Sequence, residues 1–344
     1  PPFAVVKKAT GGSTGVPMEL AYNQDSQDWR EAIKWRGYRW AGYTMGTRSL
    51  HYWGMGAVPL KSAWKKWKLQ LDRGVKRELY IDCTPRGDDA LAGVVAQIRE
   101  FRPDVILTYA QAGAALARYI TRMGARDWGT IPIIVGAEQL WPHDREAMVA
   151  AFGSEIFETY NCREVMLIGT ECAQHDGLHT SMENLIIELL VRQPDGSFRA
   201  AAPSEVGEIA VTDLHNLSNP FIRYLLSDRA TARAPGKCAC GRAHTRIGPI
   251  DGRVTETMRD GNGNPVSGLL FSILFVPLSS YTKQFQAVQH KDGTITLRVV
   301  LMEPGPIPAA VHDTTRAFAT KYLPGVTVNL VAVDDIPPTA AGKR

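Results

Sequence analysis

The stretch Asp104-Val105-Ile106-Leu107-Thr108-Tyr109-Ala110 is a short apolar run between two segments of helical character. The preceding segment, residues 89–101, ends at Arg102-Pro103, and proline disfavours the helical conformation of the residue before it. The following segment runs from Gln111 to Met123. Two more short apolar runs continue the pattern, at residues 131–135 and 155–160. This alternation predicts an α/β layer structure with largely parallel strands, in which ligands bind beyond the carboxyl ends of the strands.

The rest of the chain adds antiparallel signals. Residues 185–191 and 205–212 are typical of paired strands, with a turn at Pro194-Asp195-Gly196 between them. Within residues 28–36, Trp29, Ile33 and Arg36 recur at helical spacing and predict a helix with its tryptophans in the core. Towards the end of the chain we expect two strands, a helix and a last strand, over residues 285–289, 295–301, 312–322 and 327–333.

Composition places the chain among ordinary globular proteins. It has 344 residues, of which 44% are hydrophobic and 22% charged, and this length is enough for two domains. The net charge of +4 is too small to indicate nucleic-acid binding, and no apolar run is long enough for a membrane span. The five cysteines are odd in number and unevenly spaced, which argues against a disulfide framework and favours a reducing, cytoplasmic location.

Both ends of the chain carry conspicuous loops. The first is Thr10-Gly11-Gly12-Ser13-Thr14-Gly15-Val16-Pro17, whose glycines and hydroxyls suit a loop that wraps a polyphosphate. It lacks the Gly-Lys-Ser/Thr of a Walker loop, and an ordinary surface turn is the alternative. The second is Ile336-Pro337-Pro338-Thr339-Ala340-Ala341-Gly342-Lys343-Arg344, which presents one lysine after two prolines and small residues.

Together these ends resemble the adenylate-forming superfamily of acyl-CoA synthetases and ligases, and the motifs between them resemble phenylacetate–CoA ligase and capsule-biosynthesis adenylating proteins. The resemblance implies a large N-terminal AMP-binding domain of α/β layers plus a small β-barrel, over residues 1–252. It implies a small α+β C-terminal lid over residues 253–344, ending at the catalytic lysine loop. Relatives carry a helical region before the phosphate loop and continue beyond the lysine, so we expect this chain to lack that first region.

Two motifs resemble the family's adenine and magnesium segments. Gly136-Ala137-Glu138 resembles the adenine-binding turn, with an ordinary glycine turn as the alternative. Tyr160-Asn161-Cys162-Arg163-Glu164 resembles Tyr-Gly-x-Ser/Thr-Glu, in which the tyrosine packs on adenine and the glutamate binds Mg²⁺. Asn161 replaces the family's glycine. Arg163 replaces the hydroxyl residue, where it would pair with a phosphate or form a structural salt bridge.

Two later motifs complete the resemblance. Residues 220–228, Pro-Phe-Ile-Arg-Tyr-Leu-Leu-Ser-Asp, resemble the segment whose final aspartate binds the ribose hydroxyls, which assigns that role to Asp228. Ser227 stands where relatives have glycine. Residues 250–256 resemble the hinge motif Gly-Arg-x-Asp-Asp, with Arg253 reaching the ribose and phosphate and Thr255 in place of an aspartate.

A metal site is a further expectation. Thiolate and imidazole are the preferred ligands of zinc, and four of them make a closed structural site. The Cys-x-Cys spacing at 238–240 is tighter than usual, but some phenylacetate–CoA ligase-like proteins carry zinc on such residues. We expect Cys172, His179, Cys238 and Cys240 as ligands, with His175 as the rival imidazole and reduced free cysteines as the alternative. Cys83 and Cys162 would remain unmetallated.

The implied reaction is ATP-dependent activation of a carboxylic acid to an acyl-adenylate, with Mg²⁺ and with Glu164, Arg253 and Lys343 as catalytic residues. The acyl pocket would lie near Tyr109, Ala110 and Gln111. The acyl group would pass to coenzyme A, with a carrier-protein thiol or an amine as alternatives. A non-catalytic nucleotide-binding or zinc-stabilised interaction protein is the candidate from another class. We expect neither nucleic-acid nor membrane partners, and the sequence leaves a homodimer open.

Overall fold

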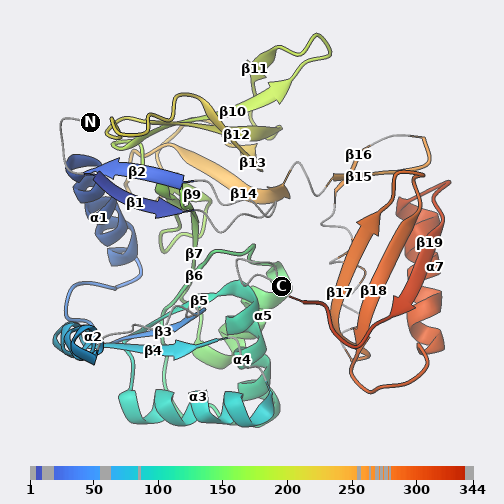
Figure 1. The fold of residues 1–344 in the computed structure, drawn as a ribbon, viewed down its shortest axis with the longest axis horizontal. Coiled ribbons are helices and arrows are strands. Elements are labelled where there is room, and N and C mark those ends of the chain that lie inside the picture. The colour runs from blue at the N-terminus through green and yellow to red at the C-terminus, as the bar shows by residue number, and fades with distance from the viewer. Residues whose placement is uncertain are drawn as a thin grey trace. The chain divides into compact units, whose positions relative to one another are not determined.

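The computed structural model describes residues 5–9, 19–54, 63–83, 87–253, 257–262, 265–267 and 280–337, with residues 271, 274 and 278 between the last two ranges. The chain divides into two compact units (Figure 1). The first contains Pro1–Leu226 and Ala230–Ile250, and the second contains Ser227–Arg229 and Asp251–Arg344. The predicted domain boundary between residues 252 and 253 stays a prediction.

The largest sheet has twelve strands in the order β11-β10-β12-β13-β14-β9-β8-β7-β6-β5-β3-β4. Five neighbouring strands are parallel to one another: β3 Ser49–Trp53, β4 Glu78–Asp82, β5 Val105–Tyr109, β6 Ile133–Gly136 and β7 Ile156–Cys162. The remaining seven are β8 Met166–Thr170, β9 Leu178–Thr180, β10 Leu185–Arg192, β11 Phe198–Ala200, β12 Val206–Asp213, β13 Tyr224–Ala232 and β14 Arg246–Arg253. The predicted α/β class is confirmed.

The antiparallel strands continue the parallel ones through β7, which pairs with β8 in the antiparallel sense. The expected pairing of residues 185–191 with 205–212 is present, because β10 and β12 are antiparallel neighbours. A separate antiparallel pair joins β1 Val5–Ala9 to β2 Glu19–Asn23, next to the N-terminal end of helix α1 Gln24–Arg39. Closure of the antiparallel strands into a small barrel stays a prediction.

Helices cover both faces of the parallel strands. On one face lie α3 Asp88–Phe101, α4 Ala110–Arg122 and α5 Pro142–Phe152, which share a core with Ile106 and Ile133. On the other face, Leu107 and Ile134 pack with Trp35 of α1. Because alternate residues of β5 and β6 are buried on opposite faces, these strands need apolar residues at nearly every position. The continuous apolar run at 105–107 follows from this burial.

The inner side of α1 differs from the expected one. The described buried residues of the helix are Ser26, Arg30, Ile33 and Gly37, whereas Trp29 and Trp35 are half-buried. The prediction that the tryptophans of this helix are core residues is confirmed in part, because Trp35 packs against the core that contains Leu107, whereas Trp29 stacks on His215. A second helix, α2 Ala63–Lys76, precedes β4 and exposes Trp64 and Trp67.

The second unit has an α+β composition. Its main sheet has the order β17-β18-β19, formed by Thr282–Gln289, Ile295–Leu301 and Val328–Ala332. Helix α7 Ala309–Tyr322 contributes Phe318 to a core that includes Leu297. A two-stranded ribbon, β15 Thr257–Arg259 and β16 Pro265–Ser267, completes the described part of this unit. The expected strands and helix are present, and the action of this unit as a lid stays a prediction.

In the described part of the chain, no helix has both the length and the apolar character needed to cross a membrane.

Candidate functional site

The parallel strands create a switch point between β3 and β5. Strand β3 has β4 on one side and β5 on the other. The connection after β3 therefore runs to one side of the sheet, and the connection after β4 crosses to the other side. Ligands of open α/β sheets bind at such points, beyond the carboxyl ends of the strands. The two strands end in Trp53 and Tyr109, whose ring centroids are 4.2 Å apart. The sequence pattern did not single out Trp53, which follows Leu50-His51-Tyr52 and precedes Gly54.

The predicted acyl segment and the predicted adenine turn touch. The backbone N–H of Gln111, at the start of α4, donates to Oε2 of Glu138 at 2.9 Å. A carboxylate is favourable there because the first N–H groups of a helix lack partners within the helix. Burial raises the pKa of Tyr109, and nearby Cys83 and Glu138 raise it further, while Arg163 acts in the opposite direction. These groups are therefore close enough to influence one another.

The turn at Gly136-Ala137 requires special backbone geometry. Ala137 has a φ of +66°, in the left-handed region that non-glycine residues seldom occupy and that recurs at functional sites. A Cβ at Gly136 would lie 2.8 Å from Oγ1 of Thr159 and 3.2 Å from Nδ2 of Asn161. Asn161, which replaces a family glycine, thus packs against the glycine of the neighbouring strand. This close approach explains why position 136 is glycine.

The predicted magnesium segment lies at the end of β7. Burial raises the pKa of the Cys162 thiol, and the adjacent Glu164 carboxylate adds to this effect. The pKa of Tyr224 is also raised, first by burial and then by Glu164 and Cys162. Glu164 therefore lies near the start of β13, the strand that carries the predicted ribose motif. Tyr160 is half-buried against the core that includes Leu20 and Phe221.

The predicted ribose residue Asp228 lies in β13, within the part of the chain that groups with the second unit. Ser227 before it has a φ of +63°. Glycine adopts this conformation without penalty, whereas an L residue pays roughly 1 kcal/mol. The backbone at this position therefore favours glycine.

Several predicted residues are beyond comparison with the structure. Arg253 ends β14, but its side chain lies outside the described residues. The same holds for Thr255, for Lys343 and for the phosphate loop with Thr10, Gly11, Gly12, Ser13, Thr14 and Gly15. Their roles stay predictions.

The predicted zinc ligands form one cluster. The ligand atoms of Cys172, His179, Cys238 and Cys240 all lie within 4.8 Å of one another. The Sγ atoms of Cys172 and Cys238 are 3.8 Å apart, and Nε2 of His179 lies 3.3 Å from Sγ of Cys172 and 3.5 Å from Sγ of Cys240. Ligand atoms bound tetrahedrally to zinc at about 2.0–2.3 Å lie about 3.5–3.8 Å apart. The donor set and its spacing fit such an ion.

Local structure explains how the cluster forms. Gly241 has a φ of +83°, and its N–H donates to the carbonyl of Cys238 at 2.9 Å, so the Cys-x-Cys segment is a tight turn. Burial and nearby cationic groups lower the pKa of His179 to about 4, which keeps its imidazole neutral as metal binding requires. His175 instead directs Nδ1 to Oε2 of Glu171 at 3.3 Å, and it is not part of the cluster.

Comparison with known proteins finds a distant curated relative. No family model matches the chain. Among curated proteins, it is similar to phenylacetate–coenzyme A ligase of Thermus thermophilus, with 24% identity over 304 residues. The match covers 86% of this chain and 65% of the relative, so the chain spans about two thirds of that relative's length.

Solved structures agree on the fold. A 2-hydroxyisobutyryl-CoA ligase in complex with 2-HIB-AMP has a TM-score of 0.69 and 18% identity, covering 99% of this chain and 72% of that one. The O-succinylbenzoate coenzyme A synthetase of Bacillus subtilis, in complex with ATP and a magnesium ion, has a TM-score of 0.62 and 16% identity. That match covers 98% of this chain and 68% of the synthetase. The predicted resemblance to the adenylate-forming superfamily is confirmed by this fold and by the distant sequence match.

Proposed function

We propose that this chain, which has the fold of adenylate-forming enzymes, activates a carboxylic acid with ATP and passes the acyl group to a thiol, most simply that of coenzyme A. In the first step a carboxylate oxygen attacks the α-phosphorus and pyrophosphate leaves. In the second step the thiol attacks the acyl carbon and AMP leaves. The observation that carries the proposal is that three segments matched to motifs of one family, at residues 109–111, 136–138 and 160–164, lie close together at the ends of β5, β6 and β7.

The catalytic work is mostly positioning and electrostatic stabilisation, because negative charge grows on the phosphate oxygens during the attack. Glu164 would hold Mg²⁺, a hard cation that takes carboxylate and phosphate oxygens. Arg163 and Lys343 would neutralise phosphate charge, and Asp228 and Arg253 would hold the ribose. The main chain at Gly136–Glu138 and the ring of Tyr160 would bind adenine. The loop from Thr10 to Gly15 would bind the β- and γ-phosphates.

The acyl pocket is proposed at Trp53, Tyr109 and Gln111. The tilted pair of rings at the ends of β3 and β5 offers an apolar wall. An aromatic or otherwise flat acyl group suits that wall. The similarity to a phenylacetate–coenzyme A ligase agrees with this substrate class.

Zinc is proposed as a structural ion on the Cys/His cluster defined above. Its four protein ligands leave no open position for substrate, which is typical of structural sites. A cytoplasmic location and a homodimer stay predictions.

The test is carboxylate-dependent exchange of labelled pyrophosphate into ATP, with a panel of aryl, arylacetic, fatty, amino and hydroxy acids. We expect exchange with one class of acid and none without acid. Binding of ATP without exchange for any acid would favour the non-catalytic alternative, which the departures at Asn161, Arg163 and Thr255 motivate. If exchange is found, AMP release is measured with coenzyme A, with a carrier-protein thiol and with an amine in turn. The acceptor that stimulates AMP release identifies the second substrate.

A further inference from the structure

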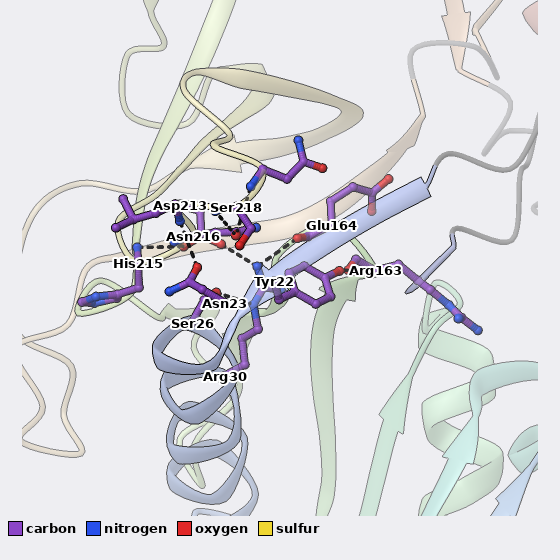
Figure 2. A network of polar contacts seen from close by, with 12 residues as sticks. Tyr22, Asn23, Ser26, Arg30, Arg163, Glu164, Asp213, His215, Asn216 and Ser218 are labelled. Carbon is purple, nitrogen blue, oxygen red and sulfur yellow. Dashed lines mark hydrogen bonds and ion pairs between the residues drawn. The ribbon is translucent and has the colours of Figure 1, made fainter. Parts of the chain in front are cut away.

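A buried ion pair lies beneath the predicted magnesium segment (Figure 2). Arg30 of α1 donates from Nη2 to Oδ2 of Asp213 at 2.5 Å, and both side chains are fully buried. Arg30 also donates from Nε to Oγ of Ser26 at 3.0 Å, and its guanidinium lies 4.0 Å from the ring centroid of Tyr22. A buried charge is costly unless it is paired and hydrogen-bonded, so this arrangement requires a specific reason.

The network ends on two consecutive main-chain carbonyls. Tyr22 donates its hydroxyl to the carbonyl of Arg163, and Arg30 donates from Nη2 to the carbonyl of Glu164 at 3.1 Å. Figure 2 shows the side chains of Arg163 and Glu164 pointing away from this network. Burial raises the pKa of Tyr22 to about 12, so the phenol keeps the proton that it donates. The network therefore holds the backbone of the segment and leaves both functional side chains to act elsewhere.

The other side of the network reaches the ribose motif. Oδ1 of Asp213 accepts the N–H groups of His215 at 3.0 Å and Asn216 at 3.2 Å. Oδ1 of Asn23, the residue before α1, accepts the N–H of Leu217 at 3.0 Å. This loop leads directly into the motif that begins at Pro220. Three segments thus meet at one ion pair: β2 and α1, the turn after β7, and the loop before β13.

We infer that Tyr22 and Arg30, supported by Asp213, are positioning residues that set the place of Glu164 and hence the affinity of the site for Mg²⁺. The inference rests on the proposed function, since it takes Glu164 as the magnesium carboxylate. All three side chains are buried in the protein interior. They act through the main chain. The hydrogen bonds to the carbonyls of Arg163 and Glu164 hold the peptide groups on both sides of the Glu164 Cα, and so fix the direction in which the Glu164 side chain projects.

The sharpest variant is Tyr22→Phe, which removes one hydroxyl and keeps the ring under Arg30. Removal of a group that is hydrogen-bonded directly to a metal ligand lowers metal affinity by roughly 10–100-fold, and the lower end of that range applies here because Tyr22 holds the main chain one residue before Glu164. We expect the Mg²⁺ concentration for half-maximal pyrophosphate exchange to rise by about tenfold. The rate at saturating Mg²⁺ should stay within about twofold of the unaltered chain, because the carboxylate itself is still present.

Tyr43→Phe is the matched control. Tyr43 is buried, and its hydroxyl contacts Oε1 of Glu78 and Oγ of Ser49, away from the turn after β7. Both variants lose a buried phenol hydroxyl, so a similar loss of thermal stability is expected in each. Only Tyr22→Phe should change the dependence on Mg²⁺. Arg30→Lys, which keeps the charge next to Asp213 but loses the planar fork, should shift the Mg²⁺ dependence in the same direction.

The outcomes separate the two ideas. If the unaltered chain catalyses pyrophosphate exchange and Tyr22→Phe shows the same Mg²⁺ dependence, the positioning role is overturned and the proposed function stays intact. Absence of exchange in the unaltered chain would overturn the proposed function instead. In that case hydrogen exchange at the amides of residues 163–165 still tests the network. Faster amide exchange in Tyr22→Phe than in Tyr43→Phe is the result expected, and equal rates would overturn the inference.

Discussion

The Cys/His cluster and the turn at Arg163-Glu164 lie at opposite ends of β8, and they are held in place in different ways. The cluster consists of side chains that converge from the segment after β8, from β9 and from the loop before β14. The turn is held through its main chain by Tyr22 and Arg30. Loss of one residue from the cluster removes part of the site itself. Loss of one residue around the turn moves a ligand without removing it.

Cys238→Ala should have the largest effect on stability, because it removes a ligand from the cluster. Loss of a structural metal ligand is among the few single changes that cost about 3–5 kcal/mol. We expect metal content to fall from about one zinc per chain to less than half, and the unfolding temperature to fall by on the order of 10 °C. Elemental analysis and thermal unfolding provide the two measurements.

Cys83→Ala is the control for that change, because Cys83 is equally buried and lies outside the cluster. It should keep its zinc and lose little stability. If both variants contain the same amount of metal and unfold at the same temperature, the cluster holds no structural zinc.

Lys343→Ala should lower the reaction rate and leave zinc content and stability unchanged. Removal of one group that stabilises transition-state charge costs about 10²–10³-fold in rate. We expect pyrophosphate exchange to fall by about that factor, with nucleotide affinity, zinc content and unfolding temperature nearly unchanged. Lys291→Ala, in the turn between β17 and β18, is the control lysine of the same unit. Equal exchange rates in the two variants would contradict the catalytic role of Lys343.

Glu158 is a half-buried titratable residue between the two regions. It lies on β7, and its N–H donates to Oε2 of Glu171, the residue before Cys172. Burial, with Glu171 adding to it, raises the pKa of Glu158 from 4.5 to about 7. The folded state therefore keeps a proton that the unfolded state loses above about pH 4.5. The stabilising contribution is full below that pH and is lost as pH rises through about 7.

Glu158→Gln should remove this dependence. Relative to the variant, the unaltered chain should lose on the order of 2 kcal/mol of unfolding free energy between pH 5 and pH 8. Urea unfolding of both proteins at the two pH values measures the difference. The opposite dependence of Glu171, whose pKa is lowered, is present in both proteins. Parallel pH profiles would show that Glu158 titrates normally.

Arg48→Ala should have the smallest effect. Arg48 and Asp104 form an exposed pair, with a distance of 2.8 Å from Nη2 to Oδ1, at the start of two parallel strands. Exposed pairs contribute little because water and salt screen them. We expect the unfolding temperature to change by less than about 2 °C and the Mg²⁺ dependence to stay the same. A shift as large as that of Arg30→Lys would remove the distinction between the buried and the exposed arginine.

The parallel part of the fold could be predicted because its signals are local. Proline at 103 ends a helix, and burial on both faces imposes an apolar run at 105–107. Arg30 could not be identified in this way. The sequence pattern of α1 is compatible with Arg30 on either side of the helix. The burial of Arg30 depends on its partner Asp213, which lies 183 positions further along the chain. Periodicity grouped Trp29, Ile33 and Arg36 and predicted that the tryptophans are core residues. It missed Arg30, the one arginine that is fully buried among the described residues of this helix.

The cluster shows a similar division. Residue types and family resemblance identified its four ligands, but spacing did not distinguish His175 from His179. The structure separates them because His175 follows a turn that directs its ring to Glu171, whereas His179 lies on β9 and faces the sulfurs. Trp53 was missed for a different reason. Its importance depends on strand order, which places β3 beside β5 despite the intervening β4.

The most direct test of carboxylate activation follows an oxygen atom. The acid identified by pyrophosphate exchange is supplied with ¹⁸O in its carboxylate, together with ATP, Mg²⁺ and coenzyme A, and the released AMP is analysed by mass spectrometry. Attack of the carboxylate on the α-phosphorus predicts AMP that carries one ¹⁸O atom. Unlabelled AMP, or label in inorganic phosphate with ADP as the product, would contradict the formation of an acyl-adenylate.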